Sequence, residues 1–116
     1  MLNAILRDLN GTTADVLASA VVSTDGLVMS SVLPQSVDED RLGAMSAALL
    51  SLGERVSLEL GRGELEQVLV KGREGFVIMT HAGEDAVLTV MTRSNARLGL
   101  IFLDIKRAAQ DIAGLI

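Results

Sequence analysis

A long helix with two different apolar sides is the feature that most constrains this fold. Residues 39–61, EDRLGAMSAALLSLGERVSLELG, place apolar side chains at the three- and four-residue spacing of a helix. One stripe has large side chains and is expected to face the core: Leu42, Met45, Leu49, Leu52, Val56 and Leu60. The opposite side has mostly small side chains, where a surface helix would carry charge: Ala44, Ala47, Ala48, Ser51 and Leu58.

The small side chains on this second side would allow another backbone to approach closely. A domain of 116 residues has little core with which to cover one helix twice. An uncovered apolar side is typical of an interaction surface. We therefore expect this side to contact another chain and association to be the main function.

The composition favours one oligomeric, cytoplasmic domain. An apolar fraction of 49% is high for a small monomer, and association would account for it. No uncharged run approaches the roughly 18 apolar residues that a membrane span needs. Arg7 and Asp8 interrupt the N-terminal apolar stretch where a signal peptide would continue. The sequence therefore predicts a cytoplasmic location.

The residue types argue against several classes of site. The absence of cysteine rules out disulfides, thiolate nucleophiles and cysteine-bound zinc, and His81 is the single histidine. A net charge of -5, with ten Lys and Arg spread along the chain, argues against nucleic-acid binding. We predict no catalytic, cofactor-binding or metal site and no nucleic-acid partner or membrane insertion.

Hydrophobic spacing predicts a helix, two strands, the long helix, three strands and a last helix. The first helix has Leu2, Ile5, Leu6 and Leu9 on one side and is expected to end at Asn10-Gly11. Strands are predicted at 16–23, 27–33, 66–71, 75–81 and 86–92, separated by short turn-rich segments. The last helix follows Ser94-Asn95. The result is one α+β domain over 1–116, a five-stranded antiparallel sheet with flanking helices.

Several blocks in this order resemble the prokaryotic branch of the Roadblock/LC7 family. They are LNAILRDLN, VVSTDGLVMSS, DEDRLGAMSAALLSLGERVSLELGRGELEQVLVKGREGFVIM, AVLTVMT and LGLIFLDIKRAAQDI. The resemblance covers essentially the whole chain. It implies a homodimer in which the long helices pack together and the third strands, 66–71, pair edge to edge.

The same resemblance implies a small Ras-like GTPase as the partner. Bacterial relatives are GTPase-activating or regulatory proteins, and eukaryotic relatives are dynein light chains or signalling scaffolds. The chain is thus expected to be a non-enzymatic adaptor. The expected dimer interface comprises Ala44, Ala47, Ala48, Ser51, Arg55, Leu58, Val68 and Val70.

Three arginines on or after the long helix are candidate partner contacts: Arg41, Arg55 and Arg62. An arginine supplied in trans can stabilise charge on a transferring phosphoryl group. Solvated arginines paired with acidic neighbours are commoner, and we favour that interpretation.

The remaining motifs have structural explanations. Gly61-x-Gly63 and Gly72-x-x-Gly75 do not lie between a strand and a following helix, so we interpret them as turns. The carboxylates of residues 38–40 suit a helix start, with Ser36 or Asp38 as the capping residue. His81 lacks further ligands for a metal and is expected to be structural or superficial.

The alternative function is a small-molecule sensor of the profilin-like or PAS-like kind. Such domains also have a five-stranded sheet with flanking helices. Their sites combine an apolar cavity with converging polar groups. Inward polar residues are scarce here, so the adaptor is preferred.

Overall fold

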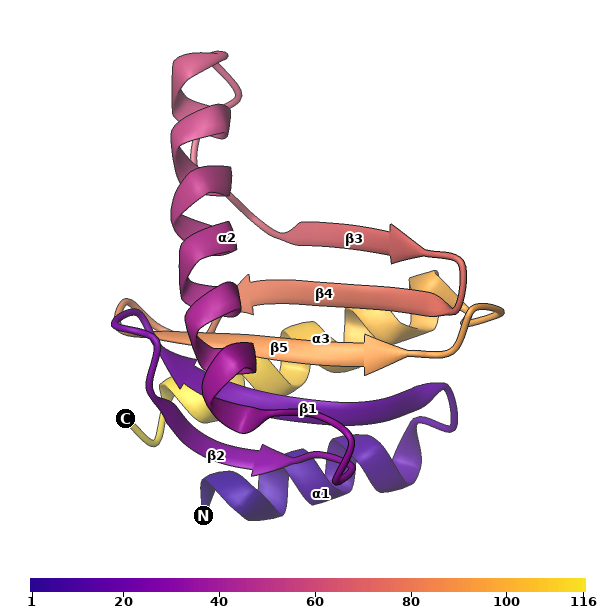
Figure 1. Ribbon diagram of the computed structural model, residues 1–116. Coiled ribbons are helices and arrows are strands. Elements are labelled where there is room, and N and C mark those ends of the chain that lie inside the picture. The colour runs from indigo at the N-terminus through magenta and orange to yellow at the C-terminus, as the bar shows by residue number, and fades with distance from the viewer.

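One antiparallel sheet lies between a long helix on one face and two shorter helices on the other (Figure 1). The computed structural model describes all of residues 1–116. The predicted fold and order of elements are confirmed: α1 (Leu2–Thr12), β1 (Val16–Ser23), β2 (Val28–Val32), α2 (Glu39–Glu59), β3 (Val68–Gly72), β4 (Gly75–His81), β5 (Ala86–Thr92) and α3 (Leu98–Ala113). No helix combines the length and apolar character needed to traverse a bilayer.

The strands lie in the order β2-β1-β5-β4-β3, and all neighbours are antiparallel. The two edges of the sheet are therefore β2 and β3. The pairing of β1 with β2 is irregular at one position. Val21 faces Ser30 and the next residue, Val22, faces Val28, so Met29 has no partner in β1. This irregularity is a β-bulge, and it interrupts one edge of the sheet.

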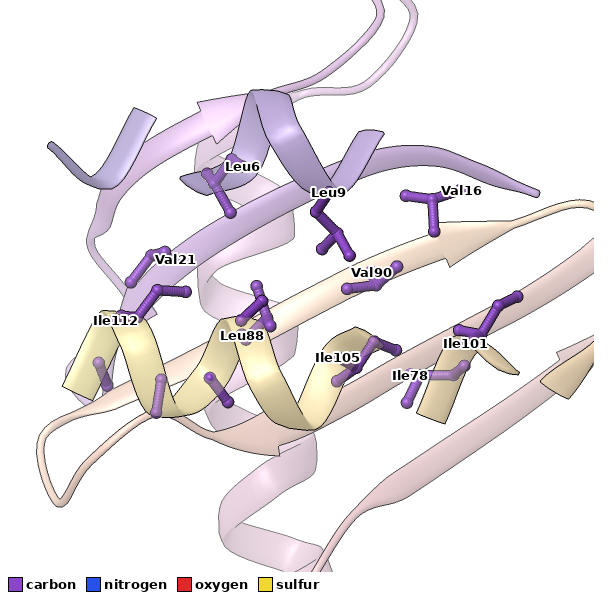
Figure 2. Packing of buried hydrophobic residues seen from close by; sticks show 14 of the residues in the cluster. Leu6, Leu9, Val16, Val21, Ile78, Leu88, Val90, Ile101, Ile105 and Ile112 are labelled. Atoms are coloured by element: carbon purple, nitrogen blue, oxygen red, sulfur yellow. The ribbon is translucent and has the colours of Figure 1, made fainter. Parts of the chain in front are cut away.

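The main core lies between the sheet and the pair α1 and α3 (Figure 2). Leu6 of α1 and Ile101 of α3 point toward the sheet, where Leu88 and Val90 of β5 meet them. All four side chains are completely buried. Burial of apolar surface here is the main stabilising contribution to the fold.

The predicted end of α1 is wrong, because the helix continues through Asn10-Gly11 to Thr12. The Asn10 side chain accepts a hydrogen bond from Ser19 Oγ at 2.7 Å and donates one to the Val32 carbonyl at 3.4 Å. These contacts hold Asn10 against the sheet in helical conformation, where the sequence alone indicated a helix end.

The side of α2 that faces the sheet combines leucines with small residues. Its buried residues are Leu42, Gly43, Ser46 and Leu50. A Cβ atom at Gly43 would overlap the carbonyl oxygen of Gly26 in the turn between β1 and β2. Ser46 Oγ accepts a buried hydrogen bond from Thr89 Oγ1 of β5 at 3.0 Å. The close approach that small residues permit is thus used within the chain.

The helix also begins and ends near the predicted residues. The carboxylate of Asp38 accepts a hydrogen bond from the Arg41 backbone N–H at 3.1 Å, which confirms Asp38 as the capping residue. The helix ends at Glu59, and Gly61 and Gly63 follow with φ of 69° and 85°. Such values are easy for glycine and strained for other residues, so the predicted turn is confirmed.

Replacing Gly43 with alanine should lower the free energy of unfolding by about 1–3 kcal/mol, because the added methyl group meets backbone that cannot move aside easily. Gly11→Ala is the matched control, since its Cβ would have no atom within 4 Å. The control should be neutral or stabilising by up to about 1 kcal/mol. Urea unfolding of both variants checks this, and equal stability of the two would contradict the close helix–sheet contact.

Candidate interaction surface

The predicted core stripe of α2 is wrong for most of its residues. Met45 is 61% exposed, Leu52 55%, Val56 49% and Leu60 68%. Only Leu42 is buried, and Leu49 is half-buried. Helical spacing identified an apolar stripe correctly, but it could not show which of two apolar stripes meets the sheet.

The two sides of α2 face opposite ends of the sheet. We call Met45, Leu49, Leu52, Val56 and Leu60 the leucine side, and Ala44, Ala47, Ala48, Ser51 and Leu58 the alanine side. Leu49 packs in a cluster with Val77, near the start of β4. Glu54, which borders the alanine side, contacts His81 at the end of β4 through Oε1 and Nε2, 3.4 Å apart.

The alanine side is also largely free of contacts within the chain. Ala44, Ala48, Ser51 and Leu58 are exposed, and Ala47 is half-buried. Arg55 lies between the two sides and is exposed as well. A single chain does not test whether a second copy covers these residues, so that interface stays a prediction.

The edge strand β3 also exposes apolar side chains, with Val70 on the face of the sheet that α2 covers and Leu69 on the face that α3 covers. Leu69 is 40% exposed and Val70 41%, whereas Val68 is half-buried beneath α2. β4 is the only strand that pairs with β3, so its outer backbone groups face away from the sheet. A flat apolar edge of this kind is a template for pairing with another chain.

The second half of α2 extends beyond the sheet. The helix crosses the start of β3, where a Cβ at Gly53 would lie 2.9 Å from Val68 Cγ2. Beyond this crossing the helix projects past β3 with no strand beneath it (Figure 1). Val56, Leu58 and Leu60 lie on this projecting part, each at least 49% exposed.

The candidate arginines lie on the exposed surface and contact neighbouring acidic or backbone groups. Arg41 lies 3.9 Å from Asp38, and Arg55 lies 3.5 Å from Glu59. Arg62 Nε donates to the Leu60 carbonyl at 3.3 Å. The predicted pairing with acidic neighbours is confirmed for Arg41 and Arg55, and exposed pairs of this kind contribute little to stability.

The residues weighed as metal ligands do not converge. No group of three or more His, Asp or Glu side chains is arranged to hold a metal ion. Asp38 caps the helix, and Glu39 accepts a hydrogen bond from Ser31 Oγ at 2.5 Å. His81 has a buried Nδ1 without a hydrogen-bond partner and an Nε2 that contacts Glu54.

Two hollows open to solvent at the end of the sheet near His81. One, about 570 Å³, is lined by Glu54, Leu58 and Glu84 among others. The other, about 470 Å³, lies between α3 and β4, with Phe102 and Lys106 on its wall. Neither is the enclosed apolar cavity that the sensor hypothesis requires.

The residues through which α2 meets the sheet were not predicted from the sequence. Gly43, Ser46, Leu50 and Gly53 recur at helical spacing, and three of these four residues are small. Glycine in a helix interior lowers helix stability, so its presence usually has a packing reason. The two glycines are the signal that could have identified this side.

Comparisons with known proteins identify the family and a set of relatives. The family model described as Roadblock/LC7 domain matches residues 2–92. The uncharacterized protein MJ1340 of Methanocaldococcus jannaschii is 42% identical over 115 residues, which cover 99% of each chain.

Solved structures share the fold. The Roadblock/LC7 domain from Streptomyces avermitilis aligns with a TM-score of 0.91 at 20% identity, covering 97% of this chain and 95% of the other. MglB of Myxococcus xanthus aligns with a TM-score of 0.89 at 24% identity, covering 98% and 93%. At these identities the likeness establishes the fold alone.

The corrected orientation of α2 predicts different outcomes for two leucines that are two residues apart. Leu50→Ala should lower the free energy of unfolding by about 2–5 kcal/mol, because Leu50 is only 2% exposed. Leu52→Ala should change it by less than about 1 kcal/mol at low protein concentration, because that side chain is 55% exposed. Denaturant unfolding compares the two, and a larger loss for Leu52→Ala would reverse the assignment.

Proposed function

Because the chain belongs to the Roadblock/LC7 family, we propose that it is a cytoplasmic, non-enzymatic homodimeric adaptor that binds and regulates a small Ras-like GTPase. The observation that carries the proposal is the exposed apolar surface formed by α2 and the β3 edge. Neighbouring large apolar side chains on a small domain favour a protein partner. Membership of the family supports a small Ras-like GTPase as that partner.

The projecting half of α2 supports a second copy as one occupant of this surface. A copy joined along β3 with two-fold symmetry would continue the sheet beneath the projecting helix (Figure 1). Symmetric pairing of this kind uses the same surface on both subunits. The sheet of each chain would then provide an apolar surface against which the projecting part of the other chain's helix can pack.

The position of the helix favours the leucine side as the contact between the two long helices. α2 crosses the sheet at Val68, the first residue of β3. A two-fold axis near the middle of β3 therefore places the second helix toward Val70. We place the leucine side in that direction because Leu49 packs in the same cluster as Val77, the residue that pairs with Val70. The proposed interface combines this side with Val68 and Val70, and the alanine side and Arg55 are left for the composite outer surface.

The GTPase would bind to surface that both subunits contribute. Arg41, Arg55 and Arg62 are exposed and remain candidate contacts for the acidic phosphates or for acidic side chains of the partner. The adaptor could act by changing the shape of the GTPase and would then need no inserted arginine. Regulation of hydrolysis or exchange is the proposed outcome of binding.

Leu52→Glu should weaken dimerisation at least about tenfold, because a carboxylate would be buried against the partner helix. Ser51→Glu is the matched control: it introduces the same charge one residue away, on the alanine side. Sedimentation over a range of concentrations measures both. Dissociation by Ser51→Glu alone would instead support the alanine side as the contact between subunits.

Mixing the purified protein with small Ras-like GTPases from the same organism should give a complex with one of them that depends on the bound nucleotide. Binding should also change the rate of GTP hydrolysis or nucleotide exchange. We expect Arg41→Ala, Arg55→Ala or Arg62→Ala each to alter regulation less than tenfold, whereas loss of an arginine inserted in trans would lower hydrolysis about 10³-fold or more. Absence of a complex in both nucleotide states would reject the GTPase as partner.

A further inference from the structure

The two ends of the edge strand β3 carry opposite charge. Glu64 and Glu66 precede the strand, whereas Lys71 lies in it and Arg73 follows in the turn to β4. All four side chains are exposed, and none takes part in an ion pair within the chain. Arg62 lies beyond the acidic end of the strand, and Glu74 lies beyond the basic end. These two residues reduce the difference in charge between the two ends but do not reverse it.

Lys71 is held on the face of the sheet that α3 covers. Its Nζ lies 5.9 Å from the centre of the Phe76 ring, and Phe76 belongs to the core beneath α3. Glu66 lies on the same face, because it lines the hollow between α3 and β4 together with Phe102. Its backbone carbonyl is fixed there by a 2.9 Å hydrogen bond from Thr80 Oγ1.

Two β3 strands related by a two-fold axis perpendicular to the sheet run antiparallel, and each face of the sheet then continues from one subunit to the other. The start of one strand therefore lies beside the end of the other. The glutamates of one subunit then lie at the same end as the basic residues of its partner, with Glu66 on the face that α3 covers and Glu64 beside α2. Charged groups arranged in this way steer encounter and fix the register of pairing.

We propose that β3 selects a second copy of this chain by charge, with Glu64 and Glu66 of one subunit paired with Lys71 and Arg73 of the other. The proposal rests on the homodimer described above and adds to it a rule for which chains can pair. Because like ends repel, parallel pairing or pairing with a chain of a different charge pattern is disfavoured. The ion pairs lie at the surface, so their effect is on specificity more than on total affinity.

The test uses two double variants of the full chain. In Glu64→Lys/Glu66→Lys both ends of β3 are basic, and in Lys71→Glu/Arg73→Glu both ends are acidic. Each variant alone should dimerise at least about tenfold more weakly than the natural chain, because like charges meet at both ends. Mixed together, they should form mostly heterodimers, in which opposite charges meet at both ends, and native mass spectrometry distinguishes the species by mass.

The matched control repeats the same net charges away from β3. Asp8→Lys/Asp25→Lys is mixed with Arg7→Glu/Arg107→Glu, all at exposed positions. These two control variants should each dimerise normally and, when mixed, give a random mixture of homodimers and heterodimers. A preference for heterodimers caused by overall charge would therefore appear in the control as well. A chain with all four β3 substitutions should recover the homodimer, which shows that the substitutions do not prevent folding.

Each outcome decides one question. Heterodimers in excess of the control, with the preference reduced at high salt, support charge selection at β3. A random mixture from the β3 variants, with normal dimers of the natural chain, overturns charge selection and leaves the homodimer intact. A natural chain that stays monomeric at all concentrations overturns the homodimer itself.

Discussion

Close packing of α2 on the sheet through small residues is the constraint on which the rest of the structure depends. Gly43 fits against the Gly26 backbone, Ser46 accepts a hydrogen bond from Thr89, and Gly53 fits against Val68. These contacts fix the rotation of the helix about its own axis. Once that rotation is fixed, the large side chains of the leucine side must remain outside the chain's own core. In the proposed dimer, folding and association therefore use different sides of one helix, and both sides contain apolar residues.

The sheet could be predicted from sequence because its signals are local. Strands β1, β4 and β5 have the predicted ends, since runs of apolar and β-branched residues stop at turn residues such as Thr24-Asp25-Gly26. The error at the end of α1 has a different origin. Asn10 is bound by Ser19 and Val32, which lie on strands distant in sequence, and no local pattern reports such contacts.

The rotation of α2 about its own axis could not be predicted from sequence. Two apolar sides were evident, and the larger side chains were assigned to the core because burial of large residues is the common case. The decisive contact comes from Gly43, which hydrophobic spacing ignores because glycine has no side chain. The surface of β3 shows the same limit, since Val70 would be equally apolar in a central strand, and only the strand order shows that it lies at an edge.

The bulge at Met29 bears on how far such an assembly can grow. A sheet with two straight edges could add copies without end and form fibrils. In the proposed dimer, the straight edge, β3, is paired with the β3 of the partner. The edge that remains unpaired on each outer side is β2, whose ladder with β1 is irregular. The proposed particle is therefore finite, because the chain offers only one regular edge for lateral growth.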